Sequence, residues 1–241
     1  MTKFLIAVLV GFSPIICFSA ATLPTDRETS REASKRNFDA VWKYLKPAIF
    51  GSDKAIRLYY RANCHVIRDF VGQEPVPFPF VKVQPPSKGK TGLATIREIF
   101  KNDKNVTVRE DSGGIIRIWI GKVPTAILQT KLTVLTLEPM DQYNPNDASS
   151  AILQTKEMQA TMRSLRFRTP PTLAGTVAEP MNGLPHLPAS LRNVTVEQAL
   201  DKIAKTWAGE GIVIYGACVV PTEPNGDTLF QLDYTGDILP K

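Results

Sequence analysis

TVEQALDKIAKTWAGEGIVIYGAC, residues 195–218, combines a helix and a strand in direct succession. Its first four residues match a capping box, in which two side chains satisfy free backbone N–H groups at the start of a helix. Apolar residues then recur at the spacing of one helix face from Val196 to Trp207. Glycines after Trp207 end the helix, and the apolar run that follows predicts a strand ending at Cys218.

The same order of elements is expected twice in the chain. After the strand ending at Cys218, an Asn-Gly turn leads to a last strand at residues 228–234. Residues 92–120 contain a short helix pattern and then two β-rich runs, 106–109 and 115–120, joined by a Gly-Gly turn. Two related helix–strand–strand units predict an α+β fold, with an antiparallel or mixed sheet and helices on one face.

Further elements are expected outside these units. A capping box at residues 29–32 predicts a helix that Pro47 ends, and an alternating strand follows at residues 56–64. Asn144 and Pro145 predict the start of a single long helix reaching Leu165.

The first 21 residues have the composition of an export signal. One lysine near the start precedes a run without charged side chains at residues 4–18, and small residues follow at 19–21. This run is shorter than the roughly 20 residues that a membrane-spanning helix needs. We expect a cleaved signal peptide at residues 1–21 and a periplasmic or secreted protein without an integral membrane span. An uncleaved anchor and a buried N-terminal strand are the alternatives.

The mature chain divides at a proline-rich stretch. Residues 169–188 contain five prolines and are expected to form a linker or long surface loop. This boundary separates an N-terminal α+β unit at residues 22–168 from a C-terminal α–β–β unit at residues 189–241. A covalent link between the two units would allow them to share one sheet.

Two cysteines remain after removal of the signal peptide. Cys64 and Cys218 each end an apolar strand pattern and share a strand face with isoleucines, so both thiols are expected to point inward. In an oxidising compartment this pair predicts one intramolecular disulfide. Two separate buried thiols are the next alternative, and a catalytic cysteine is the third.

Residues 191–203, followed by the strand pattern at 211–214, resemble the short N-terminal domains of bacterial secretins and TonB-dependent receptors. In that family a strand leads into a helix with a Glu/Gln-Ala-Leu-like start and then into further strands. The resemblance covers residues 191–235. It implies a small α+β module of the bacterial envelope that docks on other proteins. It does not imply a pore, because the chain has no room for an outer-membrane barrel.

Several classes of function lack their sequence signatures. The chain has only two histidines, and neither metal-ligand spacings nor a phosphate-binding glycine loop nor a nucleophile elbow occurs. We therefore expect no cofactor and no metal. The net charge is +6, but the basic residues are dispersed without an aromatic-basic stripe, which argues against nucleic acid as a partner.

One enzymatic arrangement can be formulated from the available residues. Cys64 or Cys218 could act as the nucleophile of a thiol hydrolase, with His186 as base and an acid such as Asp201. A disulfide would remove either nucleophile. Glu197 and Asp201 lie four residues apart on the polar side of a helix, where we interpret them as a solvated face.

A binding surface is the remaining candidate site. Tyr59 and Trp119 lie on strand faces that also carry arginines, and such mixed faces could bind a glycan or peptide or pack under a helix. His186, in a rigid proline-rich loop, is the third residue of this candidate surface. The leading hypothesis is an exported, non-catalytic envelope protein for protein interaction or assembly, with an unidentified envelope partner. A periplasmic hydrolase or transferase acting on cell wall or peptide, and a binder of glycans or small ligands, are the alternatives.

Overall fold

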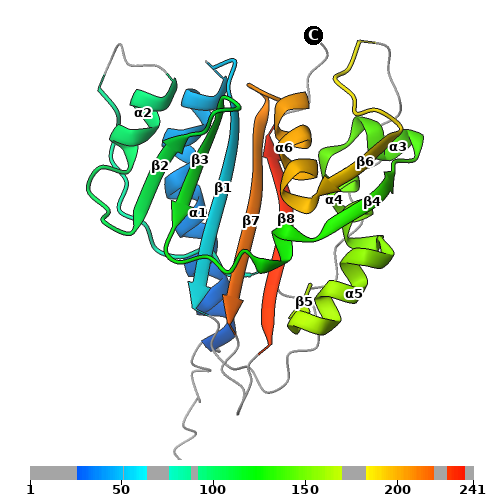
Figure 1. The fold of residues 1–241 in the computed structure, drawn as a ribbon. Coiled ribbons are helices and arrows are strands. Elements are labelled where there is room, and N and C mark those ends of the chain that lie inside the picture. Colours follow the sequence, from blue (N-terminus) through cyan, green and yellow to red (C-terminus); the bar gives the residue numbers. More distant parts are fainter. Residues whose placement is uncertain are drawn as a thin grey trace, which may run out of the picture.

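The computed structural model of the chain describes residues 26–50, 52–63, 76–87, 92–169, 183–219 and 227–236 (Figure 1). The elements, in chain order, are α1 (Asp26–Phe50), β1 (Ala55–Asn63), α2 (Gly92–Ile99), β2 (Val106–Glu110), β3 (Ile115–Ile120), the short 3₁₀ helix η1 (Ala126–Gln129), β4 (Lys131–Thr136), α3 (Pro139–Tyr143), α4 (Pro145–Gln154), α5 (Lys156–Leu165), β5 (Phe167–Arg168), β6 (Ser190–Thr195), α6 (Val196–Thr206), β7 (Gly211–Val219) and β8 (Thr228–Gly236). The predicted signal peptide, residues 1–21, lies outside the described residues.

Six strands form one mixed sheet in the order β2-β3-β1-β7-β8-β5, and β4 pairs with β6 in a separate antiparallel ribbon. The central strands β3, β1 and β7 run parallel. β2 is antiparallel to β3, and β8 is antiparallel to β7 but parallel to the short edge strand β5. The predicted α+β fold is confirmed, and its sheet is mixed. Both predicted helix–strand–strand units are present, as α2–β2–β3 and α6–β7–β8.

The N-terminal unit, residues 22–168, and the C-terminal unit, residues 189–241, share this sheet. The sequence had left this arrangement open. β1 lies between β3 of the first unit and β7 of the second. The chain regions before and after the proline-rich stretch therefore build one continuous sheet.

Helices cover both faces of the sheet, so the expectation of helices on one face is wrong. One core lies between the sheet and the helices α1 and α2, and it includes Ile56 and Leu58 of β1. The other core lies under α6, and it includes Tyr59 of β1 and Val213 of β7. The physical reason is that β1 and β7 are parallel strands with apolar residues on both sides, and such strands need cover on both faces.

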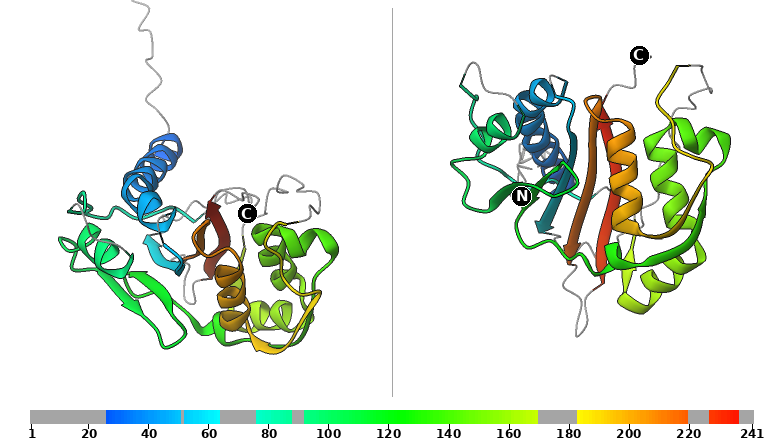
Figure 2. Two further views of the ribbon diagram at one scale, coloured as in Figure 1. Left: turned by 90° about the horizontal axis from the view of Figure 1, so that it is seen from above. Right: turned by 45° about the horizontal axis from the view of Figure 1, so that its top comes forward.

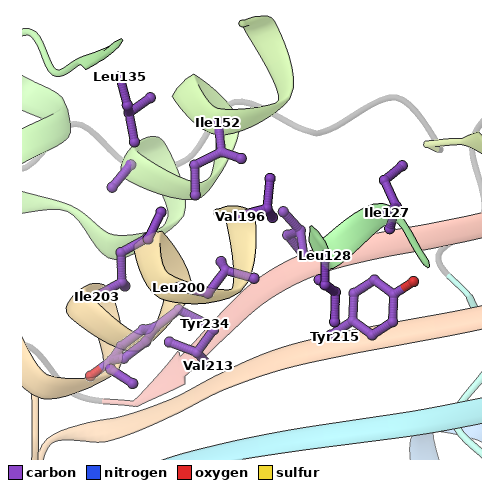
Figure 3. Packing of buried hydrophobic residues seen from close by; sticks show 14 of the residues in the cluster. Ile127, Leu128, Leu135, Ile152, Val196, Leu200, Ile203, Val213, Tyr215 and Tyr234 are labelled. Carbon is purple, nitrogen blue, oxygen red and sulfur yellow. The ribbon is translucent and has the colours of Figure 1, made fainter. Parts of the chain in front are cut away.

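Figure 2 shows α1 and α2 on the side of the sheet opposite to α6. Figure 3 shows how the second core is filled: Leu200 and Ile203 of α6 face Val213 and Tyr215 of β7. The ribbon β4–β6 and the helix α4 close this core from outside, with Leu135 and Ile152 among the buried side chains.

Three helix boundaries differ from the prediction. α1 begins at Asp26, so the backbone of the predicted capping box at residues 29–32 lies inside the helix and does not mark its start. Pro47 lies inside α1, which continues to Phe50 because Ala48 and Ile49 pack into the core and hold the last turn in place. The expected long helix from Pro145 is broken at Thr155, which is the C-cap of α4 and the N-cap of α5.

The break at Thr155 has a local cause. Its backbone is extended, and its hydroxyl donates to the carbonyl of Ile152 and accepts from the amide of Met158. A threonine side chain that satisfies backbone groups in this way favours a cap over helix continuation. Two shorter helices result, and α5 can turn toward β4 independently of α4.

Among the described residues, no helix is both long enough and apolar enough to cross a membrane.

Candidate functional site

Two arginines project from the sheet toward α6. Arg57 of β1 and Arg117 of β3 are register partners on neighbouring parallel strands. The Arg57 side chain is 0% exposed and the Arg117 side chain is 15% exposed. Two guanidinium groups at this depth require counter-charges, since burial of an unpaired charge is strongly unfavourable.

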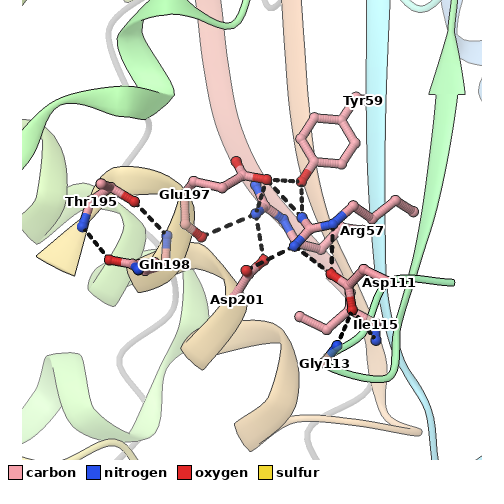
Figure 4. A network of polar contacts seen from close by, with 10 residues as sticks. Arg57, Tyr59, Asp111, Gly113, Ile115, Thr195, Glu197, Gln198 and Asp201 are labelled. Carbon is pink, nitrogen blue, oxygen red and sulfur yellow. Dashed lines mark hydrogen bonds and ion pairs between the residues drawn. The ribbon is translucent and has the colours of Figure 1, made fainter.

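The helix α6 supplies these counter-charges (Figure 4). Glu197 and Asp201 lie one turn apart and face the sheet. Arg57 Nη1 lies 2.7 Å from Asp201 Oδ1 and 3.1 Å from Glu197 Oε1. Arg117 Nη2 lies 2.8 Å from Asp201 Oδ2, and its Nη1 lies 2.7 Å from Glu197 Oε1. Each carboxylate therefore bridges both arginines.

The interpretation of Glu197 and Asp201 as a solvated helix face is wrong. Each side chain is only 20% exposed, because the arginines draw both carboxylates down onto the sheet. The start of α6 is fixed by the predicted capping box, in which Thr195 and Gln198 each accept from the other's backbone amide. This cap places Glu197 in the first turn, where the helix dipole favours a negative charge.

Asp111, in the turn between β2 and β3, completes the ion-pair network. Its Oδ2 accepts from Arg117 Nε at 2.9 Å, and its Oδ1 accepts from the amides of Gly113 and Ile115. Partial burial opposes ionisation of Asp111, but these backbone hydrogen bonds and the guanidinium outweigh it and lower the pKa of the carboxyl. The pKa of Arg117 is raised: burial opposes its charge, but the hydrogen bond with Asp201 and the surrounding negative charge more than compensate.

Tyr59 links the charged network to the apolar core. Its hydroxyl donates to Glu197 Oε1 at 2.6 Å and accepts from Arg117 Nη1. The Arg57 guanidinium lies over its ring, 4.7 Å from the centroid, in a cation–π contact. Burial raises the pKa of the Tyr59 phenol far above its usual range, so this hydroxyl stays protonated as a hydrogen-bond donor.

The structure brings together two of the three residues of the predicted binding surface. Tyr59 and Trp119 are register partners, and their rings stack with centroids 3.9 Å apart and an interplanar angle of 7°. Tyr59 is buried, whereas Trp119 is half-buried. His186 is exposed and stacks instead on Tyr143 at the end of α3, with a centroid distance of 5.2 Å.

The hydrolase arrangement of Cys218, His186 and Asp201 is wrong. Asp201 is ion-paired with both arginines on the α6 face of the sheet. Cys218 belongs to the core on the opposite face, together with Ile212 and Ile214 as the strand pattern predicted. The variant of this arrangement with Cys64 falls outside the described residues, as does the cysteine partner proposed for Cys218.

The network is suited to holding α6 on the sheet. Two guanidinium groups meet three carboxylates, so the charges are largely compensated within the protein. The Nε and Nη2 atoms of Arg57 and Oε2 of Glu197 are buried without a hydrogen-bond partner in the described part of the chain. The described residues contain no group of three or more His, Cys, Asp and Glu side chains arranged to hold a metal ion.

Sequence reasoning placed Arg57 and Arg117 on mixed strand faces but missed the ion-pair network. The signal was present in the strand pattern, since Arg57 lies in a strand whose neighbouring residues are apolar on both sides. An arginine at such a position predicts a buried carboxylate partner. What the sequence did not identify is which of its 23 acidic residues supplies the partner.

Comparison of the chain with protein-family models, with curated proteins and with solved structures found no match in any of the three.

Proposed function

We propose that this chain is an exported, non-catalytic protein of the bacterial cell envelope that serves as a protein-interaction or assembly module. The observation that carries the proposal is the ion-pair network between α6 and the sheet. Glu197 and Asp201, an acidic pair that would suit acid–base chemistry, are both bound to Arg57 and Arg117. Their role is to fix a helix in position, and a fixed helix–sheet unit is a suitable scaffold for docking.

The compartment is inferred from the sequence. The apolar leader at residues 1–21 supports export, and the resemblance of residues 191–235 to short N-terminal domains of envelope proteins supports docking on other proteins.

Photo-crosslinking of the mature protein in its own cells tests the proposal. The expected result is one envelope protein, recovered in repeated experiments and again when that partner carries the affinity tag. Recovery of abundant envelope proteins alone would contradict the interaction function. Release of product from cell-wall or peptide substrates by the purified protein, abolished in Glu197→Gln, would contradict the non-catalytic role.

A second candidate function is favoured by Trp119. Its indole stacks on Tyr59 with one face and is half-buried, and the exposed Arg61 follows on the same side of β1. A planar or sugar ring could stack on such a platform. A rise in the melting temperature with a glycan, absent in Trp119→Ala, would support this function. No shift across a broad panel of glycans and peptides would argue against it.

A further inference from the structure

The outer edge of β2 has backbone groups that point away from the sheet. Within the described residues β2 pairs only with β3. The Gly121 amide donates to the Asn105 carbonyl, and the Asp111 amide donates to the Ile115 carbonyl. These two bonds determine which residues of β2 form backbone hydrogen bonds with β3. In an antiparallel pair, every second residue directs its N–H and C=O to the partner strand.

The backbone groups of β2 therefore alternate between those that bond to β3 and those that face outward. Thr107 and Arg109 bond to β3, and the peptide groups of Val106, Val108 and Glu110 face outward. Two outward groups have partners: the Val106 amide donates to Asp103, and the Val108 carbonyl accepts from Arg97 Nε at 3.4 Å. The second bond is long and exposed, so a strand N–H could replace it.

The side chains at this edge indicate the charge of an added strand. Arg97, Lys104 and Arg109 are all exposed. The adjacent acidic residues are already paired, Glu110 with Lys54 and Asp111 with Arg117. The edge is therefore basic, and a carboxylate beside Arg109 would meet an arginine with no ion-pair partner among the described residues.

On the sheet face that carries Val106 and Val108, an added strand should present apolar side chains. Val106 and Val108 are half-buried and pack beside the core under α2. A strand next to β2 would place every second side chain beside these valines and the others beside Thr107 and Arg109. The pattern that fits is an alternation of apolar and acidic residues.

We propose that the outer edge of β2 binds an extended segment of a partner protein, with alternating acidic and apolar residues, as an additional strand of the sheet. This inference rests on the proposed interaction function and specifies its surface. A second copy of the chain fits less well, because its own β2 would bring a second set of basic side chains to the same edge. Strand addition to a sheet edge is a known mode of peptide recognition, in which main-chain bonds supply affinity and side chains supply specificity.

Residue-resolved hydrogen exchange on the whole mature protein tests the proposal. The probe is a synthetic peptide alternating Glu and Val. The amides of Val108 and Glu110 should exchange at least about tenfold more slowly with the peptide, whereas those of Thr107 and Arg109 are already bonded to β3 and should change little. A Lys–Val peptide and an N-methylated Glu–Val peptide should give no protection.

Charge reversal supplies the matched variants. Arg109→Glu should weaken binding of the Glu–Val peptide by about tenfold or more, whereas Arg192→Glu, an exposed arginine on β6, should leave it unchanged. Absence of protection at Val108 and Glu110, or equal protection by the Lys–Val peptide, would overturn the proposal. Protection that rises with protein concentration without peptide would also overturn it, in favour of a second copy.

The interaction function can be judged separately. If crosslinking recovers the same envelope partner with wild type and with Arg109→Glu, the function stands and the β2 edge is the wrong surface. If neither variant recovers a partner while the peptide still protects β2, the edge binds strands but the proposed function fails.

Discussion

Arg57 and Arg117 lie directly opposite each other on two neighbouring parallel strands, with both side chains on the same face of the sheet. Two positive charges at this spacing repel each other, and Arg57 is fully buried. The arrangement is stable only because Glu197 and Asp201 each contact both guanidinium groups. The position of α6 is therefore coupled to the burial of the two sheet arginines.

Removal of Arg57 should destabilise the protein strongly. Arg57→Met leaves Glu197 and Asp201 with one arginine in place of two, and removal of one partner of a buried ion pair costs about 3–5 kcal/mol. Urea unfolding measures the loss. Arg168→Met removes the exposed ion pair with Asp227 and should cost less than about 1 kcal/mol. Equal losses for the two variants would show that the buried network does not hold α6.

The second prediction concerns the pH dependence of stability. The pKa of Asp111 is lowered in the folded protein, so its contribution is present above the unfolded value of about 4 and is lost as the pH falls through the folded value. Asp111→Asn should therefore be less stable than wild type near neutral pH by about 1 kcal/mol. The difference should shrink toward zero in acid.

Unfolding of both proteins across the acid range measures this difference. Asp39→Asn, on the exposed side of α1, is the matched substitution and should change stability by less than about 0.5 kcal/mol. A difference between wild type and Asp111→Asn that stays constant down to strong acid would contradict the assigned role of the carboxylate.

A third prediction follows from the contact between Gly216 and Tyr60, which are register partners. A Cβ atom at Gly216 would lie 2.3 Å from Cζ of the Tyr60 ring. That ring is anchored by its hydroxyl, which donates to the Val76 carbonyl and accepts from the side-chain amide of Gln231. Gly216→Ala should therefore cost about 2–3 kcal/mol through overpacking.

A double-mutant cycle provides the control for Gly216→Ala. In a Tyr60→Ala background the obstacle is gone, so the same glycine substitution should cost much less, and the coupling should exceed about 1 kcal/mol. Additive effects would place the cost of Gly216→Ala elsewhere than in this contact.

The fourth prediction concerns covalent processing. Cys218 lies opposite Ala62, and Cys64 follows two residues later in the chain, next to the end of β1. We expect protein from its own cells to begin after residue 21 and to gain the mass of two hydrogens on reduction. Intact mass spectrometry with and without reductant measures both features. Material that begins at Met1 and has both thiols reactive would contradict the predictions of a cleaved leader and a disulfide.

Local patterns predicted the elements whose signals are complete within a few residues. The capping box at Thr195, the strand ending near Cys218 and the turn between β2 and β3 were correct because neighbouring residues determine them. The break at Thr155 was missed, although a threonine with backbone-capping capacity marks it. The prediction that Pro47 ends the first helix was wrong, because burial of Ile49 outweighs the backbone hydrogen bond that the proline removes.

Long-range pairing limited the prediction of the candidate site. Arg57 and Asp201 are 144 positions apart in the sequence, and no local pattern identifies such partners. The same limit applies to the side of the sheet that each helix covers. Apolar residues on both sides of β1 and β7 indicate cover on two faces, and this feature of the strands was not used to place the helices.

The topology also has a consequence for folding kinetics. β1 is the first strand among the described residues and a central strand of the sheet, and its neighbour β7 begins only at Gly211. The pairing of β1 with β7 cannot form before residues 211–219 have been synthesised. Contacts between such distant segments form slowly, because the entropy of closing a long loop must be overcome first. We expect refolding to be correspondingly slow, with its rate limited by the pairing of β1 with β7.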